Sequence, residues 1–234
     1  MDTDITSVAR LTEDEVRAVL AAADSAPAAG GSRPWRFHCT PSSIELFGAG
    51  TDHDATLACG AALMNLRLAI HDLGVYADVR LAPDPSQPTL LAVIRPDNER
   101  PATTRERQLV RMILDPTRTV AEPAAIVAPT AVRELRRAAE IEHAWLVPLS
   151  DEQRAALGGD QDGMVVVVGS LHDDRRALLR AGQAVQRVVL TAAVLGLHTS
   201  VGWEPVATAA ARDTLRTLIG GALSPHAVLT VRPV

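Results

Sequence analysis

The sequence predicts an α+β protein in which one helix–strand unit occurs twice and the two copies pack through their central helices as a pseudo-dimer. Segments with the helical spacing of apolar residues alternate with short β-type runs along the whole chain. The order helix, Trp-containing strand, long apolar helix and strand ending in Arg-Pro occurs twice. We therefore expect a first half at residues 1–96, a connector at 97–129 and a second half at 130–234.

The first half begins with a capping box, Thr12-Glu13-Asp14-Glu15, which starts a helix that ends at Ser25-Ala26-Pro27. A loop rich in Gly follows. The next helix is long and apolar, with Asp54 as its expected cap and Gly74 after its last turn. The strands predicted around these helices are Trp35–Cys39, Ile44–Phe47, Asp78–Leu81 and Leu90–Arg95, and the long helix is predicted at Ala55–Leu73.

The second half repeats this order, with a helix that starts at Thr130 and a strand that again contains a Trp. Asp173 is the expected cap of its long helix, which reaches Leu195 and is closed by Gly196. Met164–Gly169 is apolar throughout, which is typical of a strand in the centre of a sheet. The remaining predicted elements are strands at Ala144–Val147 and Ala227–Val231 and helices at Asp151–Leu157 and Arg212–Ile219.

The two long helices align without a gap, Cys59–Gly74 with Ala181–Gly196. Chance similarity of two Ala-rich helices would explain this match alone, but the recurring order of elements favours duplication. Small residues on both helices allow close packing, and a cofactor is expected at such an interface. The identical pairs, which extend into the following strands, are Gly60/Gly182, Ala62/Ala184, Leu68/Leu190, Leu73/Leu195, Gly74/Gly196 and Val79/Val201.

Composition excludes several classes of function. The 234-residue chain has a net charge of −5, which disfavours binding to nucleic acid or to anionic membranes. All 23 basic residues are Arg, so a Walker A phosphate loop and Schiff-base catalysis, which both need Lys, are impossible. The two cysteines form no CxxC pair, and no spacing typical of a metal site is present. We expect a cytoplasmic protein without a disulfide framework.

Other short sequence patterns indicate a functional site only weakly. Phe47-Gly48-Ala49-Gly50-Thr51 has the position of a dinucleotide loop but lacks the third glycine, so a turn is the simpler interpretation. Ser200 near His198 is not the nucleophile of a G-x-S-x-G elbow, because that pattern is absent. Trp35 and Trp145 are expected to anchor the core.

The loop Ala26-Pro27-Ala28-Ala29-Gly30-Gly31-Ser32-Arg33-Pro34-Trp35 is the most informative segment. Its glycines and small neighbours leave backbone N–H groups accessible to a flat or anionic ligand, and Arg33 adds a permanent positive charge. The alternative is a plain connection between a helix and a strand that carries a core Trp.

This loop resembles the small-Pro-Ser-x-x-Asn-x-Gln-Pro-Trp signature of FMN-dependent nitroreductases. The segment from Arg180-Ala181-Gly182-Gln183-Ala184 to Leu195-Gly196-Leu197 resembles the central helix of that family and the turn after it. Cys59-Gly60-Ala61-Ala62-Leu63-Met64-Asn65-Leu66-Arg67 narrows the resemblance to the Acg-like branch, in which one chain carries two nitroreductase-type halves. The resemblance extends over nearly the whole chain and implies FMN between the halves.

The resemblance also implies which residues hold the cofactor. The ring would lie between the loop and the turn after the second long helix, and arginines would hold the phosphate. Carried over by position, the FMN-binding residues are Ala28, Gly30, Gly31, Ser32 and Arg33 in the loop, Ser200, Val201, Gly202, Trp203 and Glu204 in the turn, and Arg111, Arg118 and Arg232.

Three of these positions depart from the family pattern, because the expected Ser, Asn and Gln are Ala28, Gly31 and Arg33. The Arg-rich motif that opens the second half in this family is reduced here to Arg111-Met112-Ile113-Leu114-Asp115-Pro116-Thr117-Arg118. The segment between Gly158 and Gly163 is also short, where Acg-like relatives carry extra helices. Two functions therefore remain. The first is an FMN oxidoreductase that moves electrons from reduced flavin, with NAD(P)H as a possible donor, to a small electron-poor acceptor. The second is a non-catalytic protein that sequesters flavin or has lost it.

The expected role of Arg33 differs between a protein with bound flavin and one without it. Beside a bound flavin its guanidinium would stabilise the anionic reduced form, whereas without flavin it would pair with a carboxylate such as Glu204. Because one chain contains both halves, a monomer is possible, and a homodimer remains the alternative.

Overall fold

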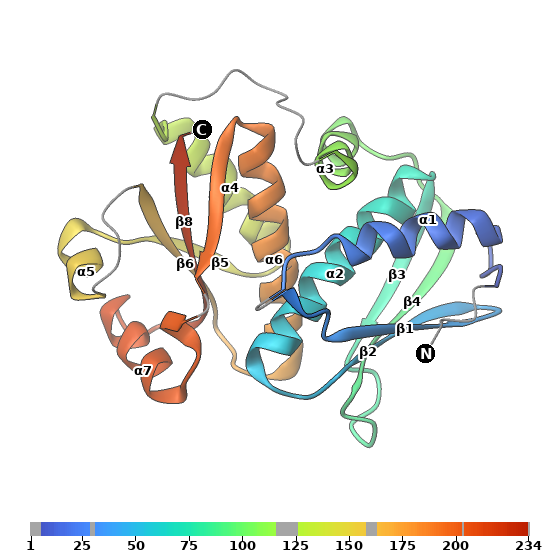
Figure 1. Cartoon of the computed structure of the whole chain (residues 1–234), viewed down its shortest axis with the longest axis horizontal. Coiled ribbons are helices and arrows are strands. Elements are labelled where there is room, and N and C mark those ends of the chain that lie inside the picture. The colour runs from blue at the N-terminus through green and yellow to red at the C-terminus, as the bar shows by residue number, and fades with distance from the viewer. Residues whose placement is uncertain (1–5, 29–30, 116–125, 158–162, 203, 234) are drawn as a thin grey trace. The chain divides into compact units, whose positions relative to one another are not determined.

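The computed structural model describes residues 6–28, 31–115, 126–157, 163–202 and 204–233. The chain divides into two compact units, Met1–Asp115 and Pro116–Val234. Each unit combines helices with one four-stranded antiparallel sheet, which confirms the predicted α+β class. Figure 1 shows the first unit in blue to green and the second in yellow-green to red.

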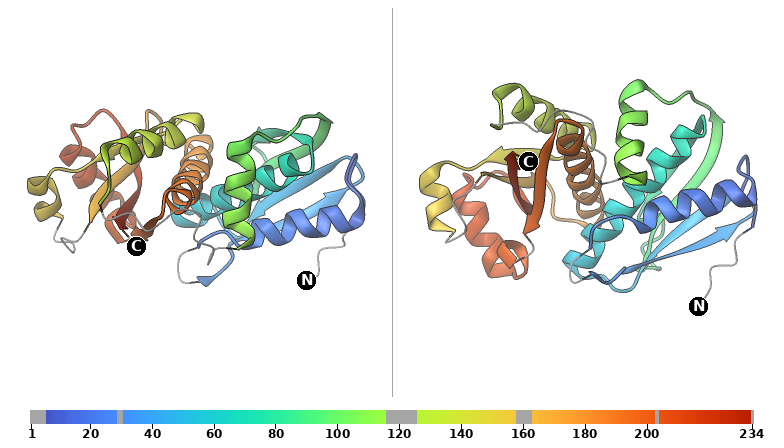
Figure 2. Two further views of the ribbon diagram at one scale, coloured as in Figure 1. Left: turned by 90° about the horizontal axis from the view of Figure 1, so that it is seen from above. Right: turned by 45° about the horizontal axis from the view of Figure 1, so that its top comes forward.

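In the first unit, the long helix α2 packs against all four strands, and α1 and α3 pack against α2. Figure 2 shows these three helices gathered over the sheet. Strand β1 alternates between buried and exposed side chains, with Trp35, Phe37 and Cys39 buried, so only one face of the sheet is covered. The elements are α1 (Glu13–Asp24), β1 (Trp35–Thr40), β2 (Ser43–Gly48), α2 (His53–Asp72), β3 (Val75–Leu81), β4 (Leu90–Glu99) and α3 (Thr104–Leu114).

In the second unit, α6 packs against three strands and against α4. The opposite face of this sheet is also covered, because Val165 and Val167 of β6 join Leu215 of α7 in a separate core cluster. Strand β6 is therefore buried on both faces, as its apolar sequence predicted. The elements are α4 (Pro129–Ile141), β5 (Trp145–Pro148), α5 (Asp151–Ala156), β6 (Met164–Ser170), α6 (Arg175–Val194), β7 (Leu197–Gly202), the 3-10 helix η2 (Glu204–Val206), α7 (Ala209–Leu218) and β8 (Ser224–Pro233).

The two sheets have the same strand order. The first runs β1-β2-β4-β3 and the second β5-β6-β8-β7, so each strand of one sheet has a counterpart at the same place in the other. The helices before the first strand and between the second and third strands also correspond. Gly74 and Gly196 both follow the central helices with positive φ, as predicted for closing residues. This common topology is consistent with the two predicted copies of one unit.

A second correspondence lies inside the helices. Asn65 of α2 and Arg187 of α6 occupy the same position of the aligned segments, and both are buried. The Asn65 amide donates to the carbonyl of Ala22 at the end of α1, at 3.1 Å. The Arg187 guanidinium donates to Glu142, which caps the end of α4, at 2.8 Å. In both units the central helix is therefore fixed to the end of the helix that precedes the sheet.

Several local predictions were wrong. The caps of the long helices are Asp52 and Asp174 instead of Asp54 and Asp173, because Asp52 and Asp174 have the extended backbone that a cap requires. Trp35 is buried, but Trp145 is 40% exposed and does not anchor a core. The stretch predicted as a connector contains α3, whose capping box is formed by Thr103 and Glu106.

Helix α3 is attached to α2 through a buried polar cluster. The Nδ1 atom of His71 lies 3.2 Å from the carboxylate of Glu106, which also accepts hydrogen bonds from Arg100 and Thr103. Burial and the Arg100 charge lower the pKa of His71 to about 4. Burial opposes ionisation of Glu106, but hydrogen bonds from Arg100 and Thr103 outweigh it and lower its pKa to about 2. At neutral pH His71 is therefore neutral and Glu106 is ionised.

We predict that acid destabilises the first unit through this cluster. The unfolded chain protonates His71 near pH 6.5, whereas the folded protein does so only near pH 4, so the free energy of unfolding falls as the pH drops between these values. The loss attributable to His71 is up to about 3 kcal/mol, and protonation of Glu106 adds a further loss below about pH 4.5. Urea unfolding at several pH values measures how the free energy of unfolding depends on pH. His71→Gln should flatten the dependence between pH 6.5 and 4, and an unchanged slope would contradict the assignment.

The buried ion pair of the second unit gives another prediction. Arg187→Met removes the cation from Glu142 inside the core and should lower the free energy of unfolding by about 3–5 kcal/mol. Arg187→Met combined with Glu142→Gln should recover part of that loss, because the charge is then removed as well. The control is Arg17→Met, which breaks an exposed pair with Glu13 on α1 and should cost less than about 1 kcal/mol. Equal losses for the two arginines would refute the role of Arg187.

Candidate functional site

The loop between α1 and β1 is held at its beginning by the central helix. Asn65 donates to the Ala22 carbonyl and, at 3.3 Å, to the Ser25 hydroxyl. Ser25 in turn donates to the Ala22 carbonyl at 2.7 Å. One buried amide thus satisfies the end of α1 and fixes the residue where the loop starts.

The end of the same loop is held by Asp24. Its Oδ1 atom accepts the indole N–H of Trp35 at 2.9 Å, and its Oδ2 atom accepts from Arg33 at 3.3 Å. The carboxylate that pairs with Arg33 in the first unit is thus Asp24. Arg33 stays 61% exposed. Its guanidinium retains donors that can reach a ligand.

The exit of the loop is also attached to the segment before α2. The Pro34 carbonyl accepts hydrogen bonds from the backbone of Ala49 at 2.7 Å and from the thiol of Cys59 at 3.5 Å. Burial, with a smaller contribution from the Asp52 charge, raises the pKa of this thiol to about 12. Cys59 therefore stays protonated and cannot act as a nucleophile.

A pocket of about 290 Å³ opens beside this exit. Asp52 and Asp54 are the charged residues of its lining. Asp52 caps α2 through the Ala55 N–H at 2.8 Å, and Asp54 contacts His53 at 3.0 Å. None of the residues that line the pocket is basic, so it does not favour a phosphate group. The lining consists of Ser32, Pro34, Ala49, Gly50, Asp52, Asp54, Ala55 and Ala58.

The structure describes four further residues of the first unit that the resemblance assigned to the site. Ser32 lines the pocket, and Gly31 has a φ of +72° with open space beside it. Ala28 is half-buried at the start of the loop. Arg111 lies exposed in the last turn of α3. Gly30 and Arg118 lie outside the described residues.

In the second unit, the predicted residues lie on the strand pair β7–β8. Ser200 is paired with Thr230, and Arg232 with His198, so Ser200 and Arg232 share one face of this pair. Val201 and Gly202 complete β7. Trp203 is outside the described residues, and Glu204 begins η2. The described residues that the resemblance assigned to the site thus fall into two groups, one in each unit.

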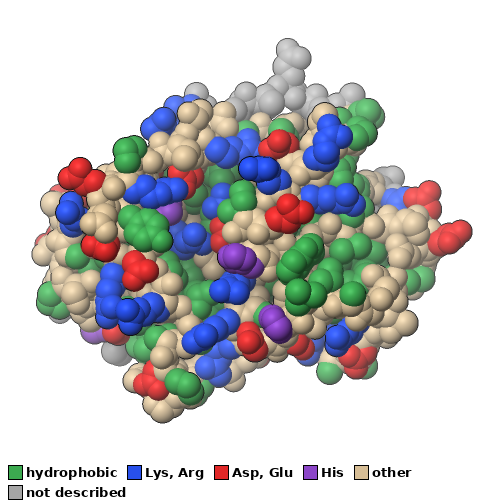
Figure 3. Space-filling view, turned by 180° about the vertical axis from the view of Figure 1, so that it is seen from behind, with side chains coloured by type: hydrophobic (Ala, Val, Ile, Leu, Met, Phe, Trp, Pro, Cys, Tyr) green, Lys and Arg blue, Asp and Glu red, His purple; other side chains and the backbone are tan. Residues whose placement is uncertain are grey.

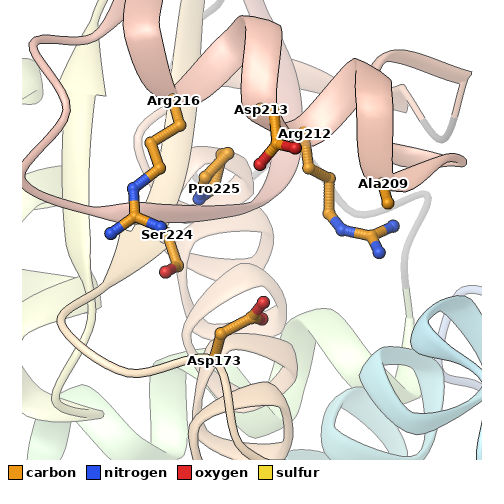
Figure 4. Close-up of a pocket in the computed structure, with 7 residues that line it drawn as sticks. All are labelled: Asp173, Ala209, Arg212, Asp213, Arg216, Ser224 and Pro225. Atoms are coloured by element: carbon orange, nitrogen blue, oxygen red, sulfur yellow. The ribbon is translucent and has the colours of Figure 1, made fainter.

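A second, smaller pocket of about 70 Å³ lies in the second unit between α7 and the start of β8. Figure 4 shows Arg216 and Arg212 at opposite sides of it, with the Asp213 and Asp173 side chains between them. Both guanidinium groups donate to backbone carbonyls, Arg212 to Val206 and Arg216 to Gly221. The charges that line this pocket balance, and they select no single class of ion.

Next to this pocket, Ser170, His226 and Asp173 form a chain. The Ser170 hydroxyl lies 2.8 Å from Nε2 of His226, and Nδ1 of His226 lies 3.8 Å from Asp173. However, Ser170 is buried and donates to the His172 carbonyl at 2.6 Å. His226 therefore donates to Ser170 and does not take its proton, so this chain is not a nucleophilic triad.

The remaining surface features support no other class of site. Among the described residues, no cluster of His, Cys, Asp or Glu could hold a metal ion. Within the same part of the chain, every helix is too short or too polar to cross a bilayer. On the face shown in Figure 3, basic and acidic side chains are interspersed.

Sequence reasoning missed the side chains that hold the loop. Asn65 was visible as the one amide within an otherwise apolar stretch of helix, which is a signal for a buried polar contact. Asp24 ends an apolar helix next to Ser25, and nothing in its local sequence indicates that it reaches Trp35. Asp52, the residue that caps α2, is not among the predicted residues, because Asp54 was the expected cap.

Comparison with known proteins identifies relatives that align over most of the chain. "Putative NAD(P)H nitroreductase Rv3131" of Mycobacterium tuberculosis is 27% identical over 281 positions, which cover 89% of this chain and 82% of that protein. "Putative NAD(P)H nitroreductase acg" of the same organism is 26% identical and covers 94% and 89%. No protein-family model matches the chain. The predicted resemblance to nitroreductases of the Acg type is thus confirmed.

Solved structures with partial similarity have related names. The NfrA1 nitroreductase from B. subtilis superposes with a TM-score of 0.40 and 15% identity, over 53% of this chain and 65% of that one. A structure titled as a putative nitroreductase in complex with FMN, from Desulfovibrio desulfuricans, has a TM-score of 0.41 and 17% identity, over 56% and 86%.

We predict that Gly48, and not Gly50, shapes the pocket wall. A Cβ atom at Gly48 would lie 2.9 Å from the Gly50 carbonyl and 2.9 Å from Leu91, so the backbone of the wall would have to move. At Gly50 the nearest atom is the Asp52 carboxylate at 3.0 Å, which can move as a side chain. Gly48→Ala should lower the free energy of unfolding by about 1–3 kcal/mol, and Gly50→Ala by clearly less. Thermal and urea unfolding of both variants test this, and similar losses would contradict it.

Proposed function

We propose that the chain binds FMN beside the loop of the first unit and works as a nitroreductase-like oxidoreductase. In this proposal it passes electrons from a nicotinamide donor through the flavin to a small electron-poor acceptor. The observation that carries the proposal is the pocket of about 290 Å³ next to the very loop that resembles the FMN-binding signature. The names of the relatives that align over most of the chain support the reaction class.

The residues of the pocket fit one part of FMN better than the other. Ala49, Gly50, Ala55 and Ala58 offer flat apolar surface, and the Ser32 hydroxyl can bond to a polar edge. This suits the isoalloxazine ring. The two carboxylates of the lining would repel a phosphate, so arginines outside the pocket would have to hold it. Among the arginines carried over by position, the one in the first unit is Arg111.

The protein's contribution to the reaction would be position and electrostatics. Bound flavin supplies the redox chemistry, so an acid–base pair is not required in the protein. The thiol of Cys59, which neighbours the pocket, is held protonated and would not act as a nucleophile. Asn65 and Asp24 would keep the loop in place, and the small side chains of α2 would leave space for the ring.

The number of flavin sites is inferred from the length of the connection between the first helix and the first strand, which differs between the two units. Residues 25–34 connect α1 with β1, whereas only residues 142–144 connect α4 with β5. In the second unit, His143 takes a left-handed conformation, with a φ of 59°, and leads directly into the strand. Of these two corresponding connections, only the one in the first unit is long enough for the FMN-binding signature. We infer one flavin per chain, in a monomer or in each chain of a homodimer.

A second function is favoured by the charges in the pocket. Asp52 and Asp54 would oppose the negative charge of reduced flavin, and Arg33, which could offset it, is bound to Asp24. A site of this kind would prefer oxidised flavin and turn over slowly. The alternative is therefore a protein that holds flavin without an efficient reaction, as the departures at Ala28, Gly31 and Arg33 also suggest.

One experiment distinguishes the oxidoreductase from the protein that only holds flavin. Protein purified with FMN should show the absorbance bands of oxidised flavin, and anaerobic addition of NADPH or NADH should bleach them if the protein is an oxidoreductase. A yellow protein that is not bleached by either nucleotide but is bleached by dithionite would support the alternative. A protein that stays colourless after incubation with FMN would refute flavin binding.

We predict that filling the pocket abolishes flavin binding without unfolding the protein. Ala55 lines the pocket and is half-buried, so Ala55→Trp should place its ring where the flavin ring would lie. The FMN dissociation constant should rise by at least about tenfold, which corresponds to about 1.4 kcal/mol. The control is Ala18→Trp, at an exposed position of α1. Unchanged FMN affinity in a folded Ala55→Trp protein would place the flavin elsewhere.

A further inference from the structure

The carboxylate of Asp24 serves two different donors with its two oxygens. Trp35 is 7% exposed, and its indole N–H is the only polar hydrogen of its ring, so inside the protein it needs an acceptor. Oδ1 of Asp24 provides this acceptor at 2.9 Å. Oδ2 accepts from Arg33 at 3.3 Å, where both side chains are exposed. One side chain at the end of α1 thus bridges to both residues that flank Pro34.

The second unit shows that this bridge is not a general feature of the repeated elements. Trp145 begins β5 as Trp35 begins β1, but Trp145 is 40% exposed and its indole can bond to water. The connection before β5 is also short. The bridge to Asp24 therefore occurs where the chain has the long loop, which links Asp24 to the loop and not to the fold of each unit.

The two contacts differ in strength. The Trp35 indole is buried, and its contact with the Asp24 carboxylate is short and part-buried, which favours a strong hydrogen bond. The Arg33 contact is long and exposed, and ion pairs of this kind contribute little to stability. An anionic group that reaches the loop can therefore compete with Asp24 for Arg33, while Trp35 stays in place.

We propose that Asp24 is a positioning residue of the flavin site, which fixes the Trp35 ring and determines how much of the Arg33 charge acts on the bound flavin. This inference rests on the proposed function. Reduction of flavin adds negative charge to its ring. Asp24 then competes with the reduced ring for Arg33, and the outcome sets the difference in affinity between reduced and oxidised FMN.

The charge role is tested with a double-mutant cycle on the full chain. Asp24→Asn keeps an oxygen for the Trp35 indole but removes the charge that holds Arg33. It should tighten binding of reduced FMN by about two- to fivefold, with a smaller change for oxidised FMN. In an Arg33→Gln background the same substitution should have no effect, because the charge on which it acts is gone. Asp14→Asn, which alters an exposed acid on the same helix, is the matched control.

The positioning role is tested without flavin. The indole N–H resonance of Trp35, assigned with Trp35→Phe, should keep its chemical shift in Asp24→Asn and move upfield in Asp24→Leu, where the acceptor is lost. An unchanged resonance in a folded Asp24→Leu protein would overturn the positioning of Trp35. An effect of Asp24→Asn on reduced FMN that is absent, or equal in both Arg33 backgrounds, would overturn the charge role.

The two levels of the proposal fail in different ways. If wild-type protein binds no flavin, the proposed function and the charge role of Asp24 are both refuted, and the indole resonance still decides whether Asp24 positions Trp35. If flavin binds and the resonance does not respond to Asp24→Leu, the proposed function stands and Asp24 has no positioning role.

Discussion

A buried polar side chain on each central helix needs a hydrogen-bond partner, and the partner that it finds fixes the arrangement of each unit. Helices α2 and α6 are buried along most of their length, so Asn65 is fully buried and Arg187 is nearly so. Asn65 bonds to the free carbonyl end of α1, and Arg187 bonds to Glu142 at the end of α4. In each unit this contact decides where the first helix ends relative to the sheet.

The difference between the two partners has a consequence for function. In the first unit the amide of Asn65 satisfies the helix end directly, and ten residues follow before the first strand, at 25–34. In the second unit a buried ion pair occupies the same place, and the chain turns at once into β5. The common topology thus carries two different connections. The long connection joins Asp24 to Trp35, and its residues Ser32 and Pro34 line the pocket. The features that suggest a cofactor site therefore gather in the first unit.

Much of the fold could be predicted, because local signals agree with it. The capping box at Thr12 and the glycines after the central helices lie where the sequence placed them. The caps Asp52 and Asp174 were misassigned by one or two residues, since several neighbouring aspartates can cap and only the path of the chain selects one. Helix α3 was missed although Thr103 and Glu106 form a capping box, because the segment was read by its polar composition.

The site was less predictable than the fold. Resemblance indicated the loop and hence Ser32, which lines the pocket, but contacts such as Asp24 with Trp35 join residues whose approach depends on the path of the loop. The roles of the residues carried over by position remain predictions. Trp145 shows the same limit, because a Trp at the start of a strand was expected in the core and lies half exposed at the sheet edge.

The central claim is that a chain with two units of one topology binds a single flavin, in the first unit. Titration of the apoprotein with FMN, followed by the change in flavin fluorescence at protein concentrations far above the dissociation constant, measures the stoichiometry directly. The account predicts saturation at one FMN per chain. Saturation at two would show that the second unit binds flavin without the long loop, and the absence of a saturable change would show that the pocket of the first unit is not a flavin site.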